Sequence, residues 1–125
     1  MDGLYGDIKA YKNGYIALHD NGLKVFDKNF EIIKEIDIPN LDIHGLDFDK
    51  TNIDYIYIVE TAHNAVGIYN LSTKNKEEEF RLSESKVDCH HINDILVRGE
   101  HIYLSMFSLR GGIRPINLYL PKDIL

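Results

Sequence analysis

The fold of this chain is decided by the stretch Asp54-Tyr55-Ile56-Tyr57-Ile58-Val59, which is apolar almost without a break. Tyrosine, isoleucine and valine pack well on a pleated surface and are typical of β-strands. A continuous apolar run of this length suits a strand that is covered on both faces. The stretch therefore predicts a strand in the middle of a sheet, with a further sheet on either side.

The pattern around this stretch occurs three times along the chain. In each unit a short strand pattern with an aspartate precedes one or two apolar runs, and the aspartates Asp7, Asp47 and Asp94 are 40 and 47 residues apart. Repeats of roughly 40–50 residues with several strands each are typical of β-propeller blades. We therefore predict an all-β fold, a partial β-propeller of about three four-stranded antiparallel blades. The blades cover approximately residues 4–39, 43–83 and 90–120 of a single propeller segment (1–125), and the last blade is incomplete.

The fourth strand of a unit differs from the others. The segment Glu77-Glu78-Glu79-Phe80-Arg81-Leu82 is mostly charged, and the segment 31–38 mixes charge with isoleucine. Charges on a free edge discourage edge-to-edge pairing, so these segments are predicted to be outermost strands. A binding surface at the three glutamates is the alternative. Turn signals such as Lys12-Asn13-Gly14 separate the strands.

Composition excludes several classes of protein. The formal net charge of −6 gives the chain no general attraction to nucleic acid or to an anionic membrane. Apolar stretches of only about five residues are too short to span a bilayer. The single cysteine, Cys89, forbids an internal disulfide and a cysteine-rich zinc site. Without a visible signal peptide, the expected compartment is the cytoplasm.

Three blades cannot close a ring, because propellers usually have four to eight. The uncovered blade faces would expose more apolar surface than soluble monomers usually do. Two partners are therefore expected as alternatives. One is a second copy of this chain, which would give a homodimeric six-bladed ring, and the other is the missing remainder of a longer propeller.

Polar residues of an unusual kind fall in the loops that share one face of such a fold. Histidine, asparagine and aspartate can bind a divalent cation, with oxygen ligands favouring calcium and added imidazoles favouring zinc. Adjacent strand residues point to opposite faces, so at most one of His90 and His91 would face a given ion. As an alternative, the repeated aspartates hydrogen-bond backbone groups and pin each blade. The candidate ligand-binding residues are His44, His63, Asn64, His90, His91 and Arg110, and the candidate metal ligands are Asn93 and Asp94.

One segment carries a family resemblance. The run from His91 through Asn93-Asp94 to Ser105 is similar to the Asn-Asp segment of six-bladed propellers of the gluconolactonase and strictosidine-synthase-like group. In that group the asparagine commonly ligates a central metal, so the resemblance implies Asn93 as a ligand. The early glutamate that the group also uses has no match here. The fuller stretch, from Cys89 to Ser108, resembles still more an uncharacterised bacterial propeller family with no assigned reaction.

Two functions follow as hypotheses. The first is a non-catalytic β-propeller scaffold for binding or interaction, which forms part of a larger ring by oligomerisation or truncation. The alternative is a metal-dependent hydrolase of the lactonase-like type, in which the ion polarises a carbonyl and a neighbouring histidine or carboxylate moves the proton. The catalytic residues of such an enzyme are not identified by the sequence.

Overall fold

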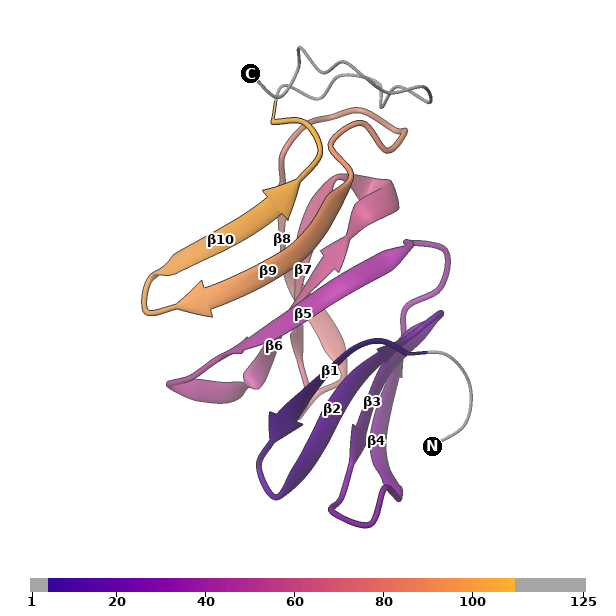
Figure 1. Ribbon diagram of the computed structural model, residues 1–125, viewed down its shortest axis with the longest axis vertical. Coiled ribbons are helices and arrows are strands. Elements are labelled where there is room, and N and C mark those ends of the chain that lie inside the picture. The colour runs from indigo at the N-terminus through magenta and orange to yellow at the C-terminus, as the bar shows by residue number, and fades with distance from the viewer. Residues whose placement is uncertain (1–4, 110–125) are drawn as a thin grey trace.

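The computed structural model describes residues 5–109, which form three antiparallel sheets (Figure 1). A single 3₁₀ turn, η1 (Thr61–His63), interrupts the strands of this range. Within the same range, no helix is long and apolar enough to cross a membrane. The strands are β1 (Tyr5–Tyr11), β2 (Gly14–His19), β3 (Gly22–Phe26), β4 (Ile32–Asp37), β5 (Ile43–Asp49), β6 (Asn52–Glu60), β7 (Ala65–Asn70), β8 (Asn75–Arg81), β9 (Ile92–Arg98) and β10 (His101–Met106).

Each sheet is a simple meander of consecutive strands. The orders are β1-β2-β3-β4 in the first sheet, β5-β6-β7-β8 in the second and β9-β10 in the third. The predicted all-β, antiparallel fold is therefore confirmed, with four strands in each of the first two sheets. Leu4 and the part of the predicted third blade beyond residue 109 lie outside the described residues.

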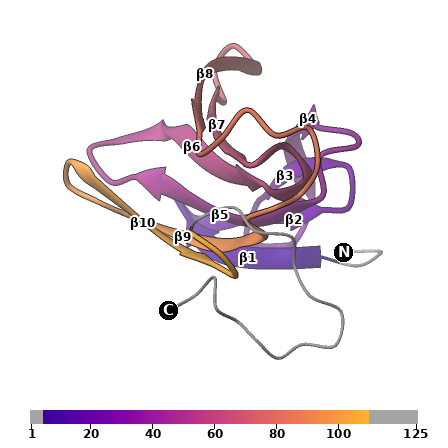
Figure 2. The ribbon, with the colours of Figure 1, turned by 90° about the horizontal axis from the view of Figure 1, so that it is seen from above.

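The three sheets are stacked with their first strands side by side. Strand β5 contacts both β1 and β9. Seen from above, β1, β5 and β9 lie along one side of the molecule, whereas β4 and β8 lie on the other (Figure 2). One apolar core fills the space between the first and second sheets, and a second, smaller core joins the second sheet to the third.

Strand β6 supplies both cores, which explains its unbroken apolar sequence. Ile56 and Ile58 belong to the core shared with the first sheet. Val59 belongs to the core shared with the third sheet, and Tyr57 packs against that core. Because successive side chains of a strand point to opposite faces, only a continuous apolar run can serve both cores. The prediction that this strand is covered on both faces is confirmed.

The outermost strands are polar, also as predicted. All residues of β8 except Arg81 are exposed, and β4 is exposed at most of its positions. The charged side chains of β8 thus lie at the free edge of the second sheet, where they discourage pairing with another strand.

Carboxylates on the first strands tie neighbouring sheets together. Asp7 of β1 accepts a hydrogen bond from the backbone N–H of Leu46 in β5, at 3.2 Å. Asp47 of β5 accepts one from the N–H of Val97 in β9, at 2.7 Å. The prediction that these two aspartates hydrogen-bond backbone groups is confirmed. Asp94, in contrast, accepts a hydrogen bond from the N–H of its own neighbour, Ile95.

The three aspartates do not lie at the same position in their strands. Asp7 and Asp94 each lie four residues before the last residue of their strand, whereas Asp47 lies two residues before the end of β5. The cause is local, because the pairing of β5 with β6 is irregular at two places. Such irregularities shift a strand against its partner without a clear mark in the sequence.

A glycine allows the second and third sheets to approach closely. A Cβ atom on Gly45 would lie 2.7 Å from the Asp94 carboxylate and 3.0 Å from its Cα atom. Any larger residue at this position would push β9 away from β5. The close approach brings Asp47 within reach of the Val97 amide.

We expect Asp47→Asn to destabilise the protein by about 1–3 kcal/mol near neutral pH, because a charged hydrogen-bond acceptor is lost. Burial raises the pKa of Asp47, but the hydrogen bonds from Lys50 and from the Val97 amide outweigh it, so that the pKa is lowered from 3.8. The stabilisation is therefore present above the ordinary aspartate pKa and disappears as the pH falls through the lowered value.

Urea denaturation across this acid range is the measurement. The Asp47→Asn variant should lose less stability on acidification than the parent chain does. Asp20→Asn, at an exposed position, is the control and should change neither the stability nor its pH dependence. If the free energy of unfolding falls equally steeply with pH in the parent and in Asp47→Asn, the assignment is contradicted.

Candidate functional site

Asn64 holds together the loops at the end of the second sheet. It is fully buried and adopts a left-handed backbone conformation after η1. Its side-chain amide donates to the carbonyls of Ser85 and Val87, and its Oδ1 accepts from the amides of Cys89 and His90. These four hydrogen bonds engage both N–H donors and both lone pairs of the side-chain amide. Asn64, a predicted ligand-binding residue, therefore positions the loop that leads to β9.

Two of the predicted histidines meet at the entrance to the first strands. The rings of His44 and His91 lie edge to face, with centroids 5.2 Å apart. Each ring also contacts a carboxylate close to it in the sequence. His44 Nε2 lies 3.0 Å from Asp42, and His91 Nδ1 lies 2.6 Å from Asp88. The end of the stack that carries these two imidazoles and two carboxylates is partly open to solvent.

His90 is turned inward instead. Its Nδ1 donates to the Ser108 carbonyl oxygen at 2.8 Å, since a carbonyl can only accept. The proton therefore sits on Nδ1. Its Nε2 is the one buried side-chain polar atom of the described residues without a hydrogen-bond partner. His90 and His91 lie in the loop before β9, and their rings point into different surroundings.

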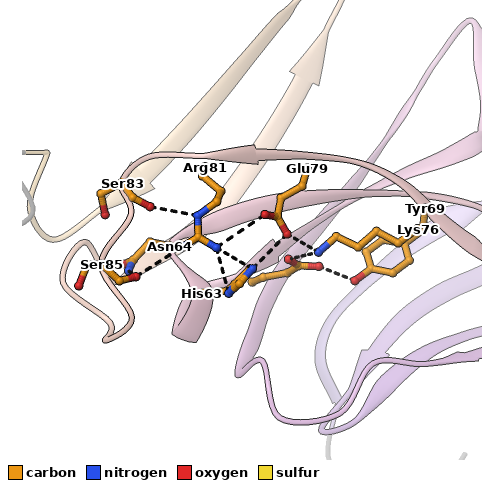
Figure 3. A network of polar contacts seen from close by, with 9 residues as sticks. His63, Asn64, Tyr69, Lys76, Glu79, Arg81, Ser83 and Ser85 are labelled. Atoms are coloured by element: carbon orange, nitrogen blue, oxygen red, sulfur yellow. Dashed lines mark hydrogen bonds and ion pairs between the residues drawn. The ribbon is translucent and has the colours of Figure 1, made fainter.

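The predicted histidine face thus divides into separate environments. His63 lies in η1 and faces β8, where Arg81 Nη1 is 2.8 Å from its Nε2. His63 takes part in a row of polar side chains along the second sheet (Figure 3). The histidines do not form one cluster, because each ring is held by a different partner close to it in the fold.

A buried ion pair forms the other end of this row. The carboxylate of Glu60, at the end of β6, is fully buried. Lys76 Nζ donates to Glu60 at 2.8 Å and to Glu79 at 2.6 Å, and the Tyr69 hydroxyl donates to Glu60. Gly67 makes room for this carboxylate, because a Cβ atom there would lie 2.3 Å from Glu60 Oε2.

The titration of the neighbouring groups reflects this pairing. Burial and the hydrogen bond to Glu60 raise the pKa of the Tyr69 hydroxyl well above its ordinary value. Burial lowers the pKa of Lys76, but its hydrogen bonds to Glu60 and Glu79 outweigh this effect and raise it. The Lys76 hydrogen bond lowers the pKa of Glu79. Lys76 and Glu79 are therefore held in their charged forms.

The same cluster is the one candidate metal centre that the described residues contain. Single ligand atoms of Glu60, His63 and Glu79 lie within 4.8 Å of one another. However, the Lys76 ammonium already bridges the two carboxylates, and Arg81 lies against both His63 and Glu79. Protein cations thus take the positions that a metal ion would need. The arrangement is a buried ion-pair network.

The predicted metal ligands Asn93 and Asp94 lie in the first part of β9, and both are exposed. Asp94 uses one carboxylate oxygen for the Ile95 amide. Across residues 5–109, no group of three ligand side chains includes Asp94. The metal site that the family resemblance implies at Asn93 stays a prediction. Arg110 lies outside the described residues.

Glu60, Lys76 and Tyr69 are not among the candidate site residues that the sequence predicts. These residues come from three neighbouring strands, β6, β8 and β7, and the strand register alone brings them together. The one sequence signal for this network is that Glu60 directly follows an apolar run, where a buried carboxylate needs a partner.

Comparison with known proteins adds nothing to this assignment. No protein-family model matches the chain, and no curated protein shows significant similarity to it.

We expect Lys76→Met to lower the free energy of unfolding by about 2–4 kcal/mol, because the Glu60 carboxylate then stays buried without its cation. Adding Glu60→Gln to the same chain should restore part of this loss, since the neutral amide needs no counter-charge. Urea denaturation of the single and double variants is the measurement. Lys28→Met, at an exposed position, is the control. A double variant no more stable than Lys76→Met alone would contradict the ion-pair assignment.

Proposed function

We propose that the chain is a non-catalytic interaction scaffold of the β-propeller type. In this proposal the stacked sheets are blades, β1, β5 and β9 line the central axis, and further blades complete a ring. The observation that carries the proposal is the repeated link between first strands, from Asp7 to the Leu46 amide and from Asp47 to the Val97 amide. The polar outermost strands support the same arrangement.

The polar chemistry of the described residues supports binding over catalysis. Glu60 is neutralised by Lys76, and His44 and His91 are each held by a carboxylate. Cys89 is buried, and its sulfur contacts the Ser83 hydroxyl at 3.7 Å. A nucleophile needs a base within hydrogen-bond reach and access to its substrate.

The end of the stack that bears His44 and His91 is the proposed binding surface. Both rings are partly exposed there, next to Asp42 and Asp88. Carboxylates beside imidazoles favour a partner that presents hydrogen-bond donors or a positive charge. The net charge of −6 agrees with a partner other than nucleic acid.

Metal binding separates this proposal from the lactonase-like hydrolase. The hydrolase needs an ion held by Asn93, with ligands from beyond the described residues. We expect Ca²⁺, Zn²⁺ and EDTA each to leave the melting temperature unchanged, and simple lactones and esters to remain intact. A metal-dependent rise in melting temperature, lost in Asn93→Ala and kept in the control Asn52→Ala, would contradict the scaffold and support the hydrolase.

A further inference from the structure

Among residues 5–109, no element covers one face of the third sheet. Ile95 and Val97 of β9 point into the core shared with the second sheet, so Leu96 points away from it. Asp94 is exposed, and its carboxylate lies beside Gly45 of β5. Leu96 pairs with Tyr103 of β10, and these two side chains are 47% and 55% exposed. Together with Asp94 and Ser105 they line a shallow groove of about 270 Å³.

The links between sheets follow one positional rule. Asp7 lies four residues before the end of β1, and its donor Leu46 lies three residues before the end of β5. Asp47 lies two residues before the end of β5, and its donor Val97 lies one residue before the end of β9. In both cases the donor is one position closer to the strand end than the acceptor. Asp94 has the same position as Asp7.

The rule specifies what Asp94 would bind. Its partner must be the amide of a residue three positions before the end of another first strand. In β1 that residue is Ile8. The side chain of Ile8 is 46% exposed, whereas the residues at the same position in the covered strands, Leu46 and Ile95, are 0% and 4% exposed. Within the part of the chain that the structure describes, no sheet covers Ile8 as sheets cover its two counterparts.

The Ile8 amide also has the required direction. Strands β1 and β2 are joined by a two-residue loop, so Tyr11 and Gly14 form the closing, hydrogen-bonded pair. Hydrogen-bonded and non-hydrogen-bonded pairs then alternate, and the pair Ile8 with Ala17 is of the second kind. The N–H of Ile8 therefore points away from β2. The β9–β10 hairpin has an equally short loop, and there the Val97 amide is free for Asp47 in the same way.

We propose that the uncovered face of the third sheet docks onto the first sheet of a second copy of this chain. Asp94 of one copy accepts a hydrogen bond from the Ile8 amide of the other, and Leu96 and Tyr103 cover the Ile8 side chain. The inference rests on the proposed scaffold function and names its partner. A second copy is favoured because the two incomplete halves of the contact lie at opposite ends of one stack. Two such contacts related by a two-fold axis close a ring, in which the third sheet of each copy is covered by the first sheet of the other.

The molar mass and dissociation constant of the full chain, measured by light scattering and sedimentation, test the contact. The parent should reach twice the 14.4 kDa of one chain as its concentration rises. Ile8→Pro removes the donor at an edge where proline is tolerated, and Asp94→Ala removes the acceptor. Each variant should weaken association by about tenfold or more, as expected for a hydrogen bond to a charged group.

Matched controls accompany both variants. The Ala10 amide also points to the open edge of β1, but the positional rule places it opposite Leu96, which has no side-chain acceptor. Ala10→Pro should therefore leave association unchanged. Glu100→Ala removes the same charge as Asp94→Ala from the turn between β9 and β10 and should also have no effect.

Circular dichroism identifies variants that fail to fold, in which case Asp94→Ala carries the test alone. A parent chain that stays at 14.4 kDa at every concentration would overturn the inference. Association that is equally strong in Ile8→Pro, Asp94→Ala and the controls would also overturn it. Neither result depends on metal binding or hydrolysis. The scaffold proposal is tested separately, by the metal and hydrolysis measurements described above.

Discussion

The structure depends on hydrogen bonds between a carboxylate on the first strand of one sheet and a backbone amide on the first strand of the next. An edge strand alternates between amides that serve its own sheet and amides that point outward. Leu46 and Val97 have outward amides, and in the stack both would be buried without a partner. Asp7 and Asp47 supply that partner, and the apolar cores then fill the space behind the link.

The second sheet joins the other two, and its sequence reflects both contacts. Alternate residues of β6 enter opposite cores, so this strand has no polar face. The strand ends in a carboxylate, Glu60, which is buried beneath Lys76 and Tyr69 from the two following strands. Gly45 and Gly67 provide the space that these close contacts need. The contacts of the Glu60 carboxylate thus tie β6 to β7 and β8.

Much of the fold could be predicted because it depends on local pattern. Apolar runs such as 54–59 and turn residues such as Asn13-Gly14 specify strands and hairpins, and charge marks β8 as an edge. The shifted position of Asp47 could not be predicted, because the irregular pairing of β5 leaves no sequence signal. The Glu60 network and the separate surroundings of His63 and His90 depend on contacts across strands and loops. Residue type alone does not indicate them.

Amide hydrogen exchange of Leu46 and Val97, followed by NMR, tests the link between sheets most directly. The account predicts slow exchange at both amides, although neither takes part in the ladder of its own sheet. It further predicts that Asp7→Ala accelerates exchange at Leu46 and that Asp47→Ala accelerates it at Val97, each with little change at the other site. Rapid exchange of both amides in the parent chain, or exchange that these substitutions leave unchanged, would contradict it.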